Sequence, residues 1–162
     1  RGSVEAALPG ADVIHFAGHA VSDSNSPGRS YLQLAASAES PDGRWKIEDF
    51  RPHMFRGDQV VILAACRGAD AVTDVQESVA SLAEAILRAG AGAVVANLWP
   101  ISDSRSRALF ELLHQRLRAG LAVDAALQAA QADYMKSYDD PAAIAAWSGA
   151  MVFRAGPGME AS

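Results

Sequence analysis

The chain has 162 residues, half of them hydrophobic and a fifth charged, with a formal net charge of −5. This length suits about one domain with a substantial core, and the scattered Lys and Arg residues argue against nucleic-acid binding, which needs clustered cations. The apolar runs are too short to cross a membrane, no signal peptide is recognised, and one cysteine cannot form an internal disulfide or a thiolate metal site, so we expect a cytoplasmic protein without membrane contact, metal or other cofactor.

The first half of the chain alternates short apolar runs with polar loops. We expect a buried strand within 11–20 (ADVIHFAGHA), a strand at 31–35, and a strand passing into a short helix over 45–55. Residues 59–65 form an apolar run that predicts a second buried strand. The apolar spacing of three and four residues over 78–90 then predicts a helix that ends at Gly90.

The second half continues this alternation of strands and helices. Residues 91–99 (AGAVVANLW) predict a buried strand, Ser102 or Asp103 can cap a helix that ends near Gly120, and a further helix covers 123–138. Pro141 is expected to break the chain before a last strand within 147–156. Apolar strands alternating with helices predict a three-layer α/β/α sandwich with a mostly parallel central sheet.

Two of the predicted strands end in residues capable of nucleophilic chemistry. His19 closes the first apolar strand, and Cys66, the only cysteine, closes the strand at 59–65. If these strands are parallel neighbours, a thiol and an imidazole meet at the sheet edge where α/β proteins bind ligands, and the imidazole can take the thiol proton. The alternative is that each is structural; His15, in mid-strand, is the rival histidine and is expected to pack or hydrogen-bond in the interior.

Four segments, in order, resemble a known family. They are DVIHFAGHA, VVILAACRGAD, LAEAILRAGAGAVVANLWPISD and AAWSGAMVFRAG. Together they resemble a CHAT domain, a branch of the caspase-like cysteine peptidases related to separase. The Ala-Cys-Arg-Gly core around Cys66 also matches the caspase signature, and His19 lies 47 residues before Cys66, near the interval of that signature. The resemblance covers residues 1–156 as one peptidase domain, expected to be the C-terminal portion of a larger protein and to lack upstream elements, with 157–162 as a tail.

The resemblance implies roles for individual residues. Cys66 would be the nucleophile of peptide-bond hydrolysis through a thioester, and His19 would protonate the leaving amine. The backbone N–H groups of Ala20 and Cys66 would stabilise the oxyanion. This chain has Ala20 where the family usually has glycine, which would be strained if the position required a positive φ, and it has Arg67-Gly68 where Glu-Thr is commonest.

The resemblance also implies a binding site for a basic residue before the scissile bond. Asp103 corresponds to the acidic residue that separase-type members carry after their Leu-Trp strand and would bind Lys or Arg; alternatively it caps the following helix. Asp70 and Asp23 are weaker options, and Trp99 could wall the pocket, although a tryptophan at a strand end is more often core.

The leading hypothesis is therefore a regulated bacterial cysteine endopeptidase that acts on a protein or peptide substrate. The family context suggests a role in antiviral defence or cell-death signalling, with a fused or associated regulatory domain. A catalytically inactive CHAT-like scaffold is the main alternative. A small-molecule-binding α/β domain with a buried Cys66 ranks last, because the sequence has neither a phosphate loop nor a GxGxxG motif.

Overall fold

A computed structural model describes residues 2–21, 26–38, 40–66, 75–99 and 101–156. The side chains of residues 27, 65, 66 and 75–78 are outside this description. The predicted tail at 157–162 and the candidate residues Asp23 and Asp70 also lie outside the described residues. Cys66 is therefore placed by its backbone alone.

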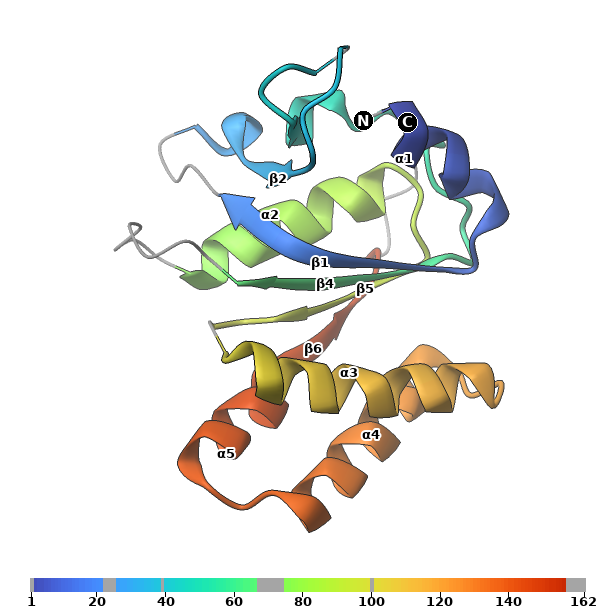
Figure 1. Cartoon of the computed structure of the whole chain (residues 1–162). Coiled ribbons are helices and arrows are strands. Elements are labelled where there is room, and N and C mark those ends of the chain that lie inside the picture. The colour runs from blue at the N-terminus through green and yellow to red at the C-terminus, as the bar shows by residue number, and fades with distance from the viewer. Residues whose placement is uncertain (1, 22–25, 39, 67–74, 100, 157–162) are drawn as a thin grey trace.

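Within the described residues the chain forms six strands and five α-helices (Figure 1). The strands are β1 (Val13–Val21), β2 (Tyr31–Gln33), β3 (Arg44–Lys46), β4 (Val60–Cys66), β5 (Ala93–Asn97) and β6 (Ala150–Phe153). The helices are α1 (Gly2–Ala7), α2 (Val75–Arg88), α3 (Asp103–Arg118), α4 (Val123–Ser137) and α5 (Pro141–Ser148), with short 3₁₀ turns at Leu8–Gly10, Pro27–Arg29 and Ile47–Asp49.

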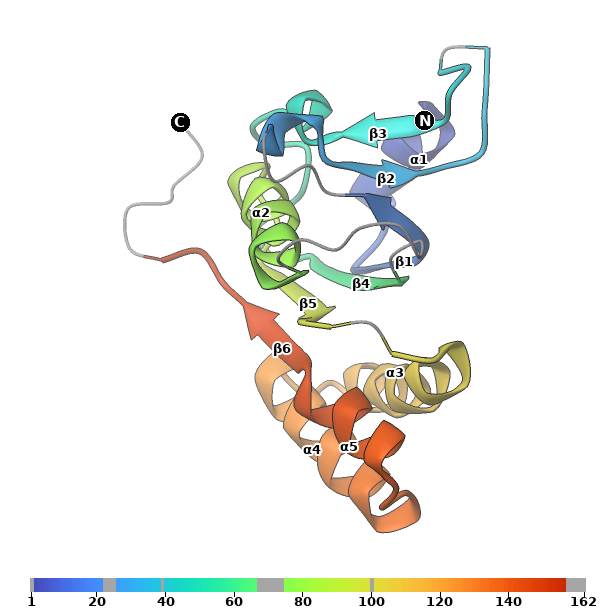
Figure 2. The ribbon, with the colours of Figure 1, turned by 90° about the vertical axis from the view of Figure 1, so that its left-hand side faces the viewer.

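The six strands form one sheet in the order β3-β2-β1-β4-β5-β6. β1, β4 and β5 are parallel, whereas β2, β3 and β6 are antiparallel to their neighbours. Helix α2 covers one face, and α3, α4 and α5 cover the other (Figures 1 and 2). This arrangement confirms the predicted α/β/α sandwich and locates its parallel part in the three central strands.

The central strands β4 and β5 are buried on both faces, as their apolar runs predicted. On β4, Val61 and Leu63 pack in the core beside α2, while Ile62 packs in the core formed by α3, α4 and α5. Val94 and Val95 of β5 divide between the two cores in the same way. Successive side chains of a strand point to opposite faces, and the described side chains of β4 and β5 follow this alternation.

Strand β1 is buried on one face only. Ile14 and Phe16 pack into the core beside α2, whereas His15, Ala17 and His19 are exposed. His15 hydrogen-bonds to His114 and packs against Phe110 of α3, as expected. The expectation that it does so in the interior is wrong, because α3 does not cover this face of β1 completely. The open face is the structural basis of the candidate site.

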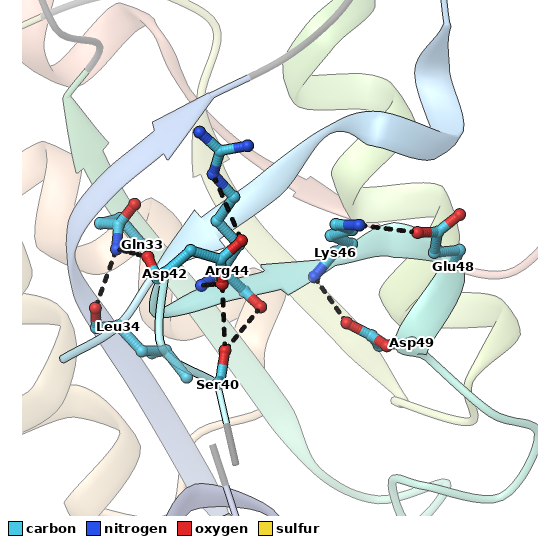
Figure 3. Close-up of polar contacts among 8 residues, drawn as sticks. All are labelled: Gln33, Leu34, Ser40, Asp42, Arg44, Lys46, Glu48 and Asp49. Atoms are coloured by element: carbon cyan, nitrogen blue, oxygen red, sulfur yellow. Dashed lines mark hydrogen bonds and ion pairs between the residues drawn. The ribbon is translucent and has the colours of Figure 1, made fainter. Parts of the chain in front are cut away.

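The β2–β3 hairpin supports the end of β1 (Figure 3). Gln33 pairs with His19 in the strand register, and its side-chain amide donates to the carbonyls of Leu34 and Asp42, both at 3.0 Å. Gly43 has a φ of 65°, and a side chain there would lie 2.3 Å from the Leu34 carbonyl oxygen. These contacts close the hairpin turn beside the strand end that carries His19.

Pro141 begins a helix instead of breaking the chain, contrary to the expectation. The Asp140 side chain accepts a hydrogen bond from the Ala143 N–H at 3.0 Å and so caps α5. Proline is tolerated at the first helical position because its missing N–H has no partner there in any case. The last strand therefore starts only at Ala150.

Candidate active site

His19 and Cys66 lie directly opposite each other at the carboxyl ends of neighbouring parallel strands. The β1–β4 register runs from Val13 opposite Val60 to His19 opposite Cys66. Adjacent strands are about 4.8 Å apart, so the two backbones are neighbours across one strand spacing. Cys66 ends β4 as the sequence predicted, but β1 continues past His19 to Val21, so His19 does not end its strand. The register adds that the two residues lie at the same level of the sheet.

The open face of β1 forms one wall of a groove of about 630 Å³. Helix α3 forms the opposite wall, and Ala64 of β4 contributes to the groove between them. The lining is mostly apolar but includes several ionisable side chains. The lining residues are His15, Ala17, Gly18, His19, Ala64, Asp103, Ser106, Arg107, Phe110, Glu111 and His114.

The two ends of the groove have different chemistry. Helix α3 enters from the carboxyl edge of the sheet, with Asp103 as its first residue, and reaches His114 about 16 Å further on. His15 and His19 are separated by about 13 Å along β1. His15 contacts His114 at one end of the groove. His19 lies at the other end of the β1 segment and Asp103 at the other end of α3, so His19 and Asp103 share the second end of the groove.

The Asp103 carboxylate is unpaired within the described part of the chain. Ser102, with extended backbone, occupies the N-cap position of α3, and Asp103 follows it as the first helical residue. No hydrogen bond or ion pair joins the exposed Asp103 side chain to another described residue. An acidic residue in the first turn interacts favourably with the helix dipole, yet this carboxylate also remains available to a cation in the groove.

A pair of histidines closes the other end of the groove. His15 Nδ1 and His114 Nε2 lie 2.7 Å apart, the ring centroids are 4.9 Å apart and the ring planes are inclined by 18°. The two nitrogens are much closer to each other than the two ring centroids are. The rings therefore meet edge to edge, as in an N–H···N hydrogen bond, rather than face to face. Phe110 packs edge-on against His15 at 5.5 Å.

Burial lowers the pKa of both histidines of this pair. A positive charge on His114 lowers the pKa of His15 further, and the positive charge of Arg118 lowers the pKa of His114 further. Sequence reasoning gave His114 no role. The two histidines are 99 positions apart, so no local pattern could join them; the only signal is that His15 and His19, four residues apart on a strand, share a face.

Trp99 lies against α5 and does not line the groove. Its indole N–H donates to the Ala145 carbonyl at 2.7 Å, and a side chain at Gly149 would lie 2.8 Å from the ring. This contact holds α5 against the end of β5. The expected role of Trp99 as a pocket wall thus gives way to a structural one.

Ala20 fits its position without strain. It lies within β1 opposite Leu32 of β2, and among the described residues other than glycine only His53 has a positive φ. Alanine is therefore compatible with the backbone that follows His19, and its N–H is retained.

Comparison with known families gives one match. The family model for the CHAT domain matches residues 1–155. The chain belongs to the CHAT family. CHAT domains are related to the caspase-like cysteine peptidases, and the α/β sandwich described above is consistent with that fold. A search of curated proteins gives no match.

Among the described residues, no three His, Cys, Asp or Glu side chains come together as ligands for a metal ion. In the same part of the chain, every helix is too short or too polar to cross a lipid bilayer.

Proposed function

We propose that this CHAT domain is a cysteine endopeptidase that cleaves a protein substrate after a basic residue. The observation that carries the proposal is the register of His19 opposite Cys66, with the exposed His19 lining a groove. Ile62 and Ala64 of β4 lie on the α3 side of the sheet, and Ala64, two residues before Cys66, lines the groove. The family membership makes peptide hydrolysis the chemistry to test first.

The proposed reaction needs only these two side chains and water. The Cys66 thiolate attacks the substrate carbonyl carbon, and the N–H groups of Ala20 and Cys66 stabilise the resulting oxyanion. The His19 imidazolium donates a proton to the amine as the C–N bond breaks, leaving a thioester on Cys66. Imidazole then takes a proton from water, which attacks the thioester and releases the carboxylic acid and the thiolate.

Asp103 is proposed to bind the basic side chain before the scissile bond. The carboxylate has no partner in the part of the chain that the structure describes and lies at the His19 end of the groove, while Ala17 and Ala64 offer apolar surface to the methylene groups of Lys or Arg. By the family resemblance, we also propose that a fused or associated partner controls the activity, in defence or cell-death signalling.

Covalent labelling of the full chain tests the proposed peptidase activity. A peptidyl acyloxymethyl ketone ending in arginine should add one probe mass, and because the chain has a single cysteine, Cys66→Ala should abolish the adduct. His19→Ala should slow labelling, since the imidazole no longer promotes the thiolate. The proposal would be contradicted if Cys66 reacts with iodoacetamide equally slowly with and without His19 and does not react with the peptide probe. That outcome would favour a scaffold.

A second probe ending in norleucine tests the role of Asp103. Asp103→Asn should reduce labelling by the arginine probe by about tenfold, the effect of one charged contact, and leave the norleucine probe unchanged. Asp139→Asn, at an exposed site that does not line the groove, is the matched control. If Asp103→Asn lowers only the melting temperature and not the selectivity, Asp103 serves the helix alone.

A further inference from the structure

Three charged side chains of α3 line the groove: the carboxylates of Asp103 and Glu111 and the guanidinium of Arg107. Arg107 and Glu111 form an ion pair at 2.7 Å and offset each other. Asp103 has no such partner among the described residues. While the His15–His114 pair is neutral, Asp103 is therefore the uncompensated charge among the α3 side chains that line the groove; Arg118, near His114, lies outside this lining.

The His15–His114 pair can change its charge without losing its hydrogen bond. One proton between His15 Nδ1 and His114 Nε2 is enough for the N–H···N bond. A neutral pair has this proton, and a pair with one added proton keeps it while carrying a charge of about +1. Only protonation of both facing nitrogens would break the contact, so a single protonation alters the charge of the groove rather than its shape.

We propose that the His15–His114 pair makes the affinity of the groove for cationic side chains depend on protons. In its neutral form the pair leaves Asp103 uncompensated, and the groove accepts a Lys or Arg side chain; with one added proton the pair offsets Asp103 and weakens that binding. The inference rests on the proposed preference for basic residues and adds to it a pH-dependent regulation of the same site.

The surroundings favour the neutral pair at neutral pH. Burial lowers the pKa of both rings, and Arg118, near His114, lowers the pKa of His114 further. The other charged or ionisable groups that line the groove are Asp103, Arg107, Glu111 and His19. The experiment compares variants that all retain His19.

Binding of a fluorescent peptide to the Cys66→Ala protein tests the proposal without turnover. The probe is a peptide amide ending in arginine, the control is the same peptide with neutral citrulline, and anisotropy is measured at low salt at about pH 8 and about pH 5.5. Acidification should weaken arginine binding by about two- to fivefold, as expected at low salt for one charge about 16 Å away, and leave citrulline binding unchanged.

His114→Gln is the decisive variant, because its amide can still donate to His15 Nδ1 without titrating with it. The acid-induced loss should shrink in this variant and disappear when His15→Gln is added, with melting temperatures confirming that both proteins are folded. Arginine binding that does not depend on pH, or that weakens equally in the variants, would overturn the role of the pair while leaving Cys66 labelling unaffected.

Two further outcomes separate this inference from the proposed function. If arginine binds no better than citrulline at about pH 8, the groove is not a cation site and the inference fails, whether or not Cys66 is labelled. If binding depends on pH as expected but no probe labels Cys66 in the unsubstituted protein, the peptidase proposal fails and the pH-dependent cation site remains.

Discussion

Replacing Gln59 with leucine should destabilise the fold substantially. Gln59 is fully buried, and its amide nitrogen donates to the carbonyls of Leu8 at 2.5 Å and Ala11 at 2.7 Å. Its amide oxygen accepts from the Arg56 N–H at 2.8 Å. One side chain thus ties the entry of β1 to the entry of β4.

The expected cost follows from the groups that lose their partner. Leu8 O keeps a hydrogen bond from the Ala11 N–H at 3.2 Å, so the Ala11 carbonyl and the Arg56 N–H are the two groups left without one. An unsatisfied buried polar group costs about 1–3 kcal/mol, and both sites are partly open to water, which gives about 2–4 kcal/mol in total. For a chain of this size that corresponds to a fall in melting temperature of about 5–15 °C.

Urea unfolding followed by circular dichroism measures this difference. The midpoint should fall while the m-value stays constant, because the two proteins expose the same surface on unfolding. Gln128→Leu, at an exposed site on α4, is the control and should change the free energy of unfolding by less than about 0.5 kcal/mol. A Gln59→Leu protein as stable as this control would refute the assigned role of the amide.

Three other outcomes follow from single contacts. Gly92→Ala should destabilise by about 1–3 kcal/mol in urea unfolding, because a side chain there would lie 2.2 Å from the Gly57 carbonyl oxygen, whereas Gly10→Ala, in open space, should not. Trp99→Phe should cost about 1 kcal/mol through loss of the bond to Ala145 and leave probe selectivity unchanged; altered selectivity would return Trp99 to the site. The fold lowers the pKa values of both paired histidines from 6.5, so the unfolded chain binds protons first as the pH falls. Their contribution to the free energy of unfolding should be fully present above about pH 6.5 and should be lost as the pH drops through the folded pKa values. The loss should be smaller in His114→Gln, and an equal loss would contradict the assignment.

The sequence predicts the layers of this fold well because its strands and helices carry strong periodic patterns. The three-and-four spacing of α2 is typical of a helix, and the apolar runs of β4 and β5 have the length of buried strands, at 7 and 5 residues. The error at Pro141 arose where two effects of one residue compete: proline ends helices from within but begins them readily after a capping residue such as Asp140. The short α5 has too few turns to reveal itself by periodicity.

The candidate site was predictable only where it depends on strand ends. His19 and Cys66 follow apolar runs, so their position at the sheet edge could be inferred from the chain alone. The groove could not, because it exists only where α3 fails to cover β1. How far α3 covers β1 depends on helix packing, and so does the contact of His15 with His114.

The alignment of His19 with Cys66 is a consequence of how the core packs. A one-residue slip of β1 against β4 would move the side chains of one strand to the wrong face, exposing Phe16 to the groove side and withdrawing it from the core that it shares with Leu63. A two-residue slip would preserve the faces but would break the hydrogen bond from the Val60 N–H to the Asp12 carbonyl and the contacts of Gln59. The register that the proposed chemistry requires is thus maintained by apolar burial along the strands and by the Gln59 amide where they begin. Gln59→Leu, which removes the contacts of that amide, should therefore slow Cys66 labelling even though residue 59 lies at the opposite end of β4.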